Sequence, residues 1–229
     1  MRYIDNRNKE PKELTVFRET TPGATYDDLR CKSVIRQKLI DEQGYICAYC
    51  MGKITIDNST IEHYIPQTRH KDSPYSEEEH KKQSLLYSNM CGVCVNASEH
   101  CDKKRGNKPI KILNPHVSYC EDLITYTLDG EIIPTGTNED EVKSDINLLG
   151  LNCKNLKAKR VAAKDEVWKR FKTEYKKEDW TKEIFLQKAN LYRHKQKRKG
   201  GGYKFHAYCN FIVWYFSYYA ENYKFSNNK

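Results

Sequence analysis

CAYCMGKITIDNSTIEHYIPQ, residues 47–67, combines two cysteines with a glutamate and a histidine in a short span. A Cys-x-x-Cys pair, Cys47 and Cys50, is followed after a short polar gap by Glu62 and His63. Such a pair offers two thiolates from one tight turn to a tetrahedral zinc ion, and the other two ligands must come from elsewhere. The rest of the sequence has to show whether the cysteines bind metal for its own sake or support the histidine that follows.

Three further cysteines, Cys91, Cys94 and Cys101, can supply the second pair of ligands. One Cys-x-x-Cys pair alone would fit thiol redox chemistry as well, whereas a second cluster nearby favours structural zinc. The first residues of the chain are polar and charged, unlike a secretory leader, and no long apolar run follows. We therefore expect a cytoplasmic protein whose nine cysteines stay reduced and include metal ligands.

The composition favours a globular chain with a polyanionic partner. The 229 residues are 38% hydrophobic and 12% aromatic, which is enough to close a core despite a charged fraction of 31%. A formal net charge of +9 favours nucleic acid as the partner, because clustered Lys and Arg gain affinity by displacing counterions from phosphates. A merely basic, solvated surface would carry the same charge, so the motifs must decide between the two.

Local patterns predict a helix before the cysteines and short strands after them. Apolar residues at three- and four-residue steps predict a helix over 26–43, which Gly44 ends. Residues 1–30 are interrupted by Pro and Gly and are expected to be mostly extended and loop-like. Short strands are expected at 53–56 and 60–65.

The remaining segments are a loop, a hairpin and a helical region. The polar stretch 67–84 is predicted to be a surface loop. Alternating residues on both sides of Asp129-Gly130 predict a β-hairpin, and strong helix formers predict a mostly helical last third. The aromatic segment 203–225 is expected to pack within this chain or against a partner. Five histidines receive no role: His70, His80, His116, His194 and His206.

Three motifs together resemble the HNH endonucleases: Glu62-His63 in IEHYIP, Asn89 in LLYSNMCGVC, and the run HCDKKRGN at 100–107. The resemblance implies an α+β fold, in which a small zinc-stabilised ββα-metal core is flanked by an N-terminal helix and a mostly helical C-terminal region. It also implies that the cysteines are a scaffold for His63. The zinc ligands would be Cys47, Cys50, Cys94 and Cys101, and Cys91 and His100 remain as alternative ligands.

The family pattern implies a role for each polar residue of the motifs. His63 would be the general base, since an imidazole that is neutral near physiological pH can take a proton from water. A catalytic Mg²⁺ or Mn²⁺ would bind Glu62 and Asp102, with Asn107 as a candidate third ligand, and would stabilise the leaving 3′ oxygen. Asn89 would orient His63 through hydrogen bonds. The basic residues that follow are expected to bind substrate phosphates: Lys103, Lys104 and Arg105.

Longer stretches in order, among them MRYIDNRNKEPKELTVFR, LIDEQGYICAYC and INLLGLNCKNLKAKR, resemble a narrower family, the PtuB-like HNH effectors of Septu-type and retron-associated anti-phage systems. This resemblance implies a PtuA-like ATPase of the ABC/SMC class as a partner, and in retrons also a reverse transcriptase with its RNA-linked DNA. The chain has no GxxxxGK-Ser/Thr loop, so a nucleotide-driven step would come from the partner. Because one site cuts one strand at a time, two copies in the complex are expected.

We expect three segments: an N-terminal arm and helix over 1–46, the nuclease core over 47–116, and a hairpin with helices over 117–229 that docks a partner. Two other functions fit the same sequence. An HNH ribonuclease acting on tRNA would use the same site, since nothing in the motifs reads the 2′-hydroxyl. A zinc-dependent nucleic-acid-binding module without catalysis would need the cysteines and the charge, but not Glu62 and His63.

Overall fold

The computed structural model describes residues 1–5, 10–95 and 99–224 and shows a mixed α+β architecture. In these ranges the strands form two-stranded antiparallel sheets: β1 Ser59–His63 with β2 Met90–Cys94, β3 Ile124–Tyr126 with β4 Ile132–Pro134, and β5 Gln196–Lys197 with β6 Tyr203–Lys204. The α-helices are α1 Lys12–Thr20, α2 Lys32–Glu42, α3 Glu77–Ser84, α4 Asp102–Arg105, α5 Glu139–Leu148, α6 Lys154–Glu174, α7 Lys182–Arg193 and α8 Cys209–Asn222.

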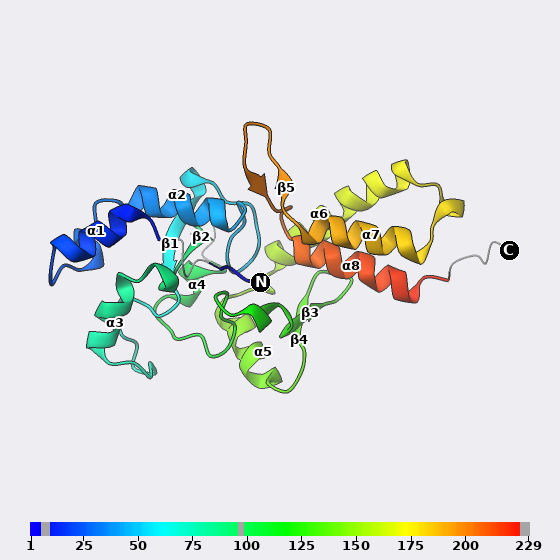
Figure 1. The fold of residues 1–229 in the computed structure, drawn as a ribbon. Coiled ribbons are helices and arrows are strands. Elements are labelled where there is room, and N and C mark those ends of the chain that lie inside the picture. Colours follow the sequence, from blue (N-terminus) through cyan, green and yellow to red (C-terminus); the bar gives the residue numbers. More distant parts are fainter. Residues whose placement is uncertain (6–9, 96–98, 225–229) are drawn as a thin grey trace.

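The β1–β2 sheet lies between the N-terminal helices and α5 (Figure 1). His63, the last residue of β1, pairs with Met90, the first residue of β2. The buried carboxamide of Gln43, which follows α2, donates to the carbonyls of Ile46 and Gly92 and accepts a bond from the Gly92 amide. The NH2 group and the carbonyl oxygen of this side chain therefore both have hydrogen-bond partners inside the protein. These bonds fix the end of α2 to the sheet and to the turn that precedes Cys47.

Two segments that the sequence predicts to be loops form helices. Helix α1 begins directly after Pro11, and its Leu14 is fully buried. Helix α3 lies inside the polar stretch 67–84 and begins with a reciprocal capping box, in which Ser76 accepts a bond from the Glu79 amide and Glu79 accepts one from the Ser76 amide. Because α3 carries few apolar residues, its amphipathic pattern is weak, and the capping signal alone marks its start.

Two other local predictions are correct only in part. The helix predicted over 26–43 begins at Lys32, and a single 3-10 turn over Tyr26–Asp28 precedes it. The strand predicted at 53–56 is reduced to one β-bridge between Ile46 and Lys53, whereas the strand predicted at 60–65 is present as β1.

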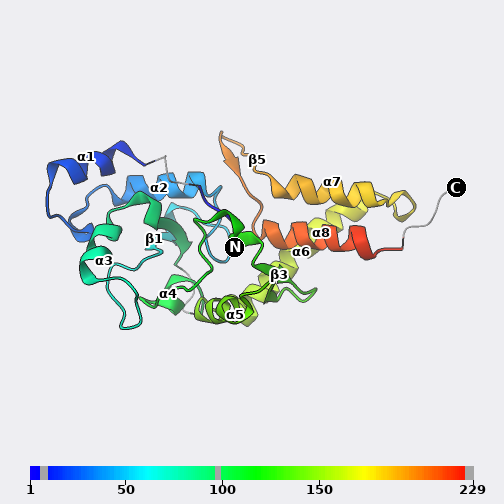
Figure 2. The same ribbon diagram turned by 60° about the horizontal axis from the view of Figure 1, so that its bottom comes forward.

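The last third agrees with the prediction of a hairpin followed by helices. Strands β3 and β4 pair on either side of Asp129-Gly130, with Thr125 opposite Ile133. Helix α8 lies beside α7 and α6 (Figures 1 and 2), and Phe211, Ile212 and Phe216 are buried inside the chain. Packing within the chain therefore accounts for much of the aromatic segment, which is the first of the two alternatives drawn from its composition.

Segments from both ends of the chain meet in the middle of the molecule. The N-terminus lies between the half that carries β1 and the half formed by α6, α7 and α8 (Figures 1 and 2). The Met1 carbonyl accepts a 2.8 Å hydrogen bond from Asn210 of α8. One hydrophobic cluster contains side chains from all three predicted segments, including Ile40, Val93 and Leu149. The segment boundaries themselves stay a prediction.

A buried carboxylate fixes the chain after α4. Asp145 of α5 accepts hydrogen bonds of 2.7 to 2.9 Å from three consecutive backbone amides, those of Lys111, Ile112 and Leu113. Three charge-assisted bonds on one carboxylate hold this segment, and with it the end of α4, against α5.

No helix within the described ranges is both long enough and apolar enough to cross a membrane.

Candidate metal centre and catalytic site

Four thiols come together at one end of the β1–β2 sheet. The Sγ atoms of Cys47, Cys50, Cys94 and Cys101 all lie within 4.8 Å of one another, and the Cys47–Cys101 and Cys50–Cys94 pairs are each 3.8 Å apart. Zn–S bonds of about 2.3 Å in a tetrahedron place neighbouring sulfurs about 3.8 Å apart. The donor type, number and spacing therefore fit a structural zinc ion.

The backbone directs these four side chains toward one point. Cys47 and Cys50 lie in a tight turn, in which the Met51 amide donates to the Cys47 carbonyl at 3.0 Å and the Gly52 amide lies 3.4 Å from the Cys50 sulfur. Cys94 is the last residue of β2. Cys101 has a φ of 59°, and its amide donates to the Leu149 carbonyl at the end of α5.

The two alternative zinc ligands lie outside the group of mutually close donors. Cys91 is three residues before Cys94 on the same strand, and an odd separation puts the two side chains on opposite faces. Burial raises the pKa of the Cys91 thiol well above its usual value. His100 is a neighbour of the thiols, because its Nδ1 lies 3.2 Å from the Cys101 sulfur and 3.8 Å from the Cys94 sulfur.

The electrostatics of the four thiols favour a bound cation. Burial raises the pKa of Cys47 and Cys101, whereas hydrogen bonds from neighbouring thiols lower the pKa of Cys50 and Cys94. Without a cation, this buried cluster cannot carry four negative charges. A divalent metal ion would stabilise all four thiolates at once, which is the form in which cysteine binds zinc.

His63 is held in one tautomer at the end of β1. Its Nε2 lies 3.0 Å from the carbonyl oxygen of Ser84, and since a carbonyl only accepts, Nε2 carries the proton. Nδ1 therefore keeps its lone pair and lies 3.3 Å from the amide nitrogen of Gln67. The Tyr26 ring packs edge-on against the imidazole, with the ring centroids 4.6 Å apart.

The environment keeps His63 neutral. The side chain is 3% exposed, and burial lowers its pKa to about 4. The positive charges of Arg105 and Lys32 act in the same direction, against the hydrogen bond to Ser84. A neutral imidazole with an oriented lone pair is the form that a general base requires.

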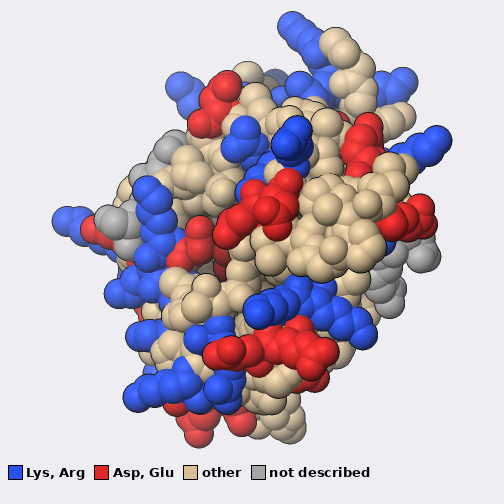
Figure 3. Space-filling view, turned by 90° about the vertical axis from the view of Figure 1, so that its left-hand side faces the viewer, with Lys and Arg blue, Asp and Glu red and all other residues tan. Residues whose placement is uncertain are grey.

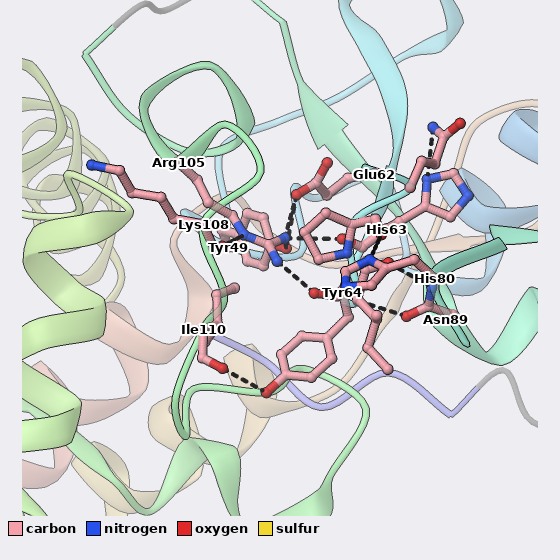
Figure 4. A network of polar contacts seen from close by, with 12 residues as sticks. Tyr49, Glu62, His63, Tyr64, His80, Asn89, Arg105, Lys108 and Ile110 are labelled. Atoms are coloured by element: carbon pink, nitrogen blue, oxygen red, sulfur yellow. Dashed lines mark hydrogen bonds and ion pairs between the residues drawn. The ribbon is translucent and has the colours of Figure 1, made fainter. Parts of the chain in front are cut away.

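Asn89 holds the backbone around His63, and no hydrogen bond in the described ranges joins it to the imidazole. Its Oδ1 accepts from the Ile65 amide at 2.8 Å, and its Nδ2 donates to the carbonyls of Ile65 and Gln83, both at 3.0 Å (Figure 4). Gln83 is next to Ser84, whose carbonyl binds the imidazole. Asn89 therefore fixes the positions of both the chain after His63 and the carbonyl that orients the ring.

Glu62 is the centre of a buried polar network (Figure 4). Its Oε1 accepts hydrogen bonds from Arg105 at 2.5 Å and from the Tyr49 hydroxyl at 3.3 Å. Burial raises the pKa of Glu62 to about 8; Arg105 opposes this effect and the nearby carboxylate of Asp102 adds to it. The two carboxylates could offer oxygen ligands to a divalent cation, although Arg105 already supplies positive charge to Glu62.

Arg105 does not have the surface position expected of a phosphate-binding residue. It is 1% exposed, and its guanidinium donates to Glu62 and Tyr49 and to the carbonyls of His63, Tyr64 and Lys108. The four-residue helix α4 turns this side chain toward the interior, so the expectation of substrate binding is wrong for Arg105. It holds the end of β1 instead.

The other residues of the basic run are at the surface. Lys103 and Lys104 are exposed on α4, as phosphate binding requires. Asn107 is exposed just after α4, and no hydrogen bond in the described ranges joins its side chain to Glu62 or Asp102. The structure thus brings Glu62 and Asp102 together but gives no sign of Asn107 as a third ligand.

Sequence reasoning missed the residues that surround His63, namely Tyr26, Gln67 and Ser84. Gln67 and Ser84 lie in the stretch predicted to be a surface loop, where only the capping box of α3 could have indicated order. Tyr26 is the first residue of the predicted helix over 26–43 and lies instead in the 3-10 turn before α2. His80 was given no role, yet its buried ring is hydrogen-bonded to the Pro66 carbonyl and, at 2.8 Å, to the Ser73 hydroxyl. His80 thereby fastens the loop after His63 to α3.

The net positive charge does not form one unbroken patch on the face that carries α1 and α3. Viewed from that end, Lys and Arg side chains line one border of the surface, and acidic side chains lie among them nearer the centre (Figure 3). The charge alone therefore does not locate a nucleic-acid surface on this face.

Comparison with known proteins supports the HNH interpretation at the level of the family. No family model matches the sequence. A protein of Vibrio cholerae serotype O1 biovar El Tor, named "Retron Vc95 putative HNH endonuclease", is 25% identical to this chain over 144 residues. The match covers 60% of this chain and 66% of the relative, so the chain spans slightly less than two thirds of that protein's length. The name of this relative contains the family that the motifs of this chain resemble, and the four clustered thiols could hold a metal ion such as zinc.

Proposed function

We propose that this protein is a metal-dependent HNH endonuclease that hydrolyses phosphodiester bonds, with DNA as the first candidate substrate. The observation that carries the proposal is the state of His63, whose imidazole is neutral and held through Nε2 by the Ser84 carbonyl at 3.0 Å, with a lone pair on Nδ1. The adjacent Glu62 meets Asp102 at the start of α4. An oriented base next to paired carboxylates suits phosphodiester hydrolysis.

The residues of the chain have defined roles in such a reaction. Nδ1 of His63 takes a proton from water, the water oxygen bonds to phosphorus, and the P–O3′ bond breaks with its electron pair going to the 3′ oxygen. Gln67 must release Nδ1 before water can donate to it, because its amide now lies 3.3 Å away. Glu62 and Asp102 would hold Mg²⁺ or Mn²⁺, which when bound stabilises charge on the phosphate and the leaving oxygen.

We propose in addition that the nuclease is the effector of a cytoplasmic anti-phage complex of the PtuB type. The retron in the name of the Vibrio cholerae relative supports this context, as do the N-terminal and central stretches that resemble the Septu effectors. The partners would be a PtuA-like ABC/SMC-type ATPase and, in a retron, a reverse transcriptase with its RNA-linked DNA. Two copies of the nuclease would allow both strands of a duplex to be cut.

Cleavage by wild type and His63→Ala tests the enzymatic proposal. Both proteins are incubated with plasmid DNA and, separately, with total tRNA, in Mg²⁺ and with the ATPase partner present, and the zinc content of each is measured. We expect the wild type to cut plasmid, His63→Ala to cut neither substrate, and both proteins to hold one zinc ion per chain.

Each other result rejects a defined part of the proposal. Cleavage of tRNA alone would replace the DNA substrate with RNA. Equal cleavage by His63→Ala and wild type would show that His63 is not the base. If neither protein cuts but both bind nucleic acid and zinc, the non-catalytic binding module is the better description.

A further inference from the structure

The segment between α7 and α8 forms a two-stranded ribbon that projects from the body of the molecule (Figure 1). Lys197 pairs with Tyr203 and Gln196 with Lys204, and Gly200, Gly201 and Gly202 form the tip. The three glycines have φ values of 96°, 98° and 73°, and apart from each glycine and its two chain neighbours no atom of the described chain lies within 4 Å of a Cβ built on any of them. The tip therefore needs glycine for its backbone and stands in open space.

The ribbon is basic over its whole length. Residues 194–206 contain five Lys and Arg and no acidic residue. Lys197, Lys199 and Lys204 are exposed, and none of them forms an ion pair within the described ranges. Tyr203, which faces Lys197 across the ribbon, is 55% exposed. Exposed lysines such as these three, with no ion pair of their own in the described part of the chain, are the electrostatic footprint of a phosphate-binding element.

The base of the ribbon is fixed to the turn that leads into the zinc-binding cysteines. The Phe205 amide donates to the Gly44 carbonyl at 2.9 Å, and Lys195 donates to the Glu42 carbonyl at 2.5 Å. The Arg198 guanidinium lies 3.8 Å from the centre of the Tyr45 ring, a cation–π contact. Gly44 and Tyr45 lie shortly before Cys47 in the sequence. The ribbon therefore has a defined position relative to the nuclease core.

We propose that this ribbon, residues 195–204, binds the phosphate backbone of duplex DNA at a place separate from the catalytic residues. This inference rests on the proposed nuclease function and adds the element that holds the substrate. The major groove of B-form DNA admits a two-stranded β-ribbon, whereas the major groove of an RNA duplex is too deep and narrow. The glycine tip carries no side chains, so its backbone can approach the duplex closely, with the lysines facing the phosphates on either side.

Binding, measured apart from cleavage, tests this inference. The parent protein carries His63→Ala so that it does not cut. The ribbon variant adds Lys197→Ala, Lys199→Ala and Lys204→Ala, and the matched control adds Lys172→Ala, Lys176→Ala and Lys177→Ala, which are exposed at the far end of α6 and just after it. Fluorescence anisotropy with a labelled DNA duplex and an RNA duplex of equal length is recorded over a range of salt concentrations, after equal zinc content and thermal stability are verified.

We expect the ribbon variant to bind the DNA duplex about 10 to 100 times more weakly than the parent at low salt. The slope of log affinity against log salt should fall by about 2 to 3, since each lost phosphate contact removes about 0.9. The control should match the parent. Equal affinity and slope for ribbon variant and control would overturn the ribbon assignment while leaving the nuclease proposal intact, and a loss confined to RNA would overturn the choice of DNA. If the parent binds neither duplex, the inference fails, and the cleavage test with the partner present decides the nuclease proposal separately.

Discussion

Arg105 places its guanidinium 2.5 Å from the Glu62 carboxylate in a region closed to solvent, and the same guanidinium holds the carbonyls of His63 and Tyr64. The side chain of Arg105 thus joins the four-residue helix α4 to Glu62 and His63 at the end of β1. Breaking a buried ion pair by removing one partner leaves the other charge without compensation.

At pH 9, where Glu62 with its pKa of about 8 is ionised, Arg105→Met should therefore lower the free energy of unfolding by about 3 to 5 kcal/mol, as loss of one partner of a buried ion pair commonly does. Chemical denaturation of wild type and variant measures the difference. Lys104→Met is the matched control on the same helix, since Lys104 is exposed and its replacement should change stability by no more than about 0.5 kcal/mol. If Arg105→Met lowered the free energy of unfolding no more than Lys104→Met does, the network around Glu62 would contribute little to stability.

Cys94→Ser should abolish tight zinc binding, whereas Cys91→Ser should leave one zinc ion per chain. The reason is that Cys94 belongs to the four mutually close thiols and Cys91 faces the other side of β2. Metal analysis of the purified proteins, after dialysis against a weak chelator, gives the stoichiometry. Zinc loss in Cys91→Ser together with retention in Cys94→Ser would reverse the ligand assignment.

The neutral state of His63 should make stability depend on pH. Burial lowers its pKa from 6.5 to about 4, so below pH 6.5 the unfolded chain binds a proton that the folded protein excludes. The contribution of a neutral His63 is complete above pH 6.5 and is lost as the pH falls toward 4. A shift of this size corresponds to about 3 kcal/mol.

Comparison with His63→Asn isolates that contribution. The pKa of the buried His116 is also lowered to about 4, so wild type loses stability from both residues in the same pH window. The difference in unfolding free energy between wild type and His63→Asn should shrink by about 3 kcal/mol from pH 7 to pH 4. A difference that stays constant over this range would show that His63 titrates normally.

The raised pKa of Glu62 should make binding of the proposed catalytic cation depend on pH. With a pKa of about 8, the carboxyl binds a proton near neutral pH that the cation must displace. The affinity for Mn²⁺ should fall by about tenfold per pH unit below pH 8, because one proton is exchanged. Electron paramagnetic resonance of free Mn²⁺ measures this, with Glu62→Gln expected to bind weakly at every pH and Glu178→Gln, at an exposed position, to behave as wild type.

Gly150 has a steric role at the zinc site. A Cβ added there would lie 2.2 Å from the Glu99 carbonyl oxygen, two residues before Cys101, whereas a Cβ on Gly136 would meet nothing within 4 Å. Both glycines have positive φ, so replacement by Ala costs about 1 to 2 kcal/mol in backbone strain at either position. Gly150→Ala should lose more stability than Gly136→Ala and should release zinc to a chelator faster. Equal behaviour of the two variants would indicate that the 99–101 backbone adjusts freely.

The sequence allowed prediction of the features that depend on short-range patterns. The Asp129-Gly130 turn, the strand that ends at His63 and the Cys47–Cys50 pair each follow from residues a few positions apart. The choice of Cys94 and Cys101 as the other two cysteines of the cluster comes from the family resemblance, because the spacing leaves Cys91 open as well. Asn89 hydrogen-bonds to backbone groups of Ile65 and Gln83, and the role of orienting His63 that its place in the motif implies stays a prediction.

The features that could not be predicted depend on contacts between distant segments. Tyr26 reaches His63 only because α1 and the turn before α2 fold back over β1, and no local signal specifies that path. The Ser84 group that binds His63 is a backbone carbonyl, which every residue has, so the identity of residue 84 does not predict this contact. Arg105 belongs to a run of basic residues whose neighbours are exposed, so only the direction of a four-residue helix distinguishes it from them.

The cysteine cluster also has a consequence for the unfolded chain. Cys47 and Cys101 are 54 residues apart, and between them lie β1 and β2, two strands of five residues each. A metal ion bound to both would close this stretch into a loop, and by the relation used for cross-linked chains such a closure removes denatured-state entropy worth about 4 kcal/mol. An ion that stays bound to both cysteines in the unfolded chain would therefore restrict the conformations of the segment between them before β1 and β2 form.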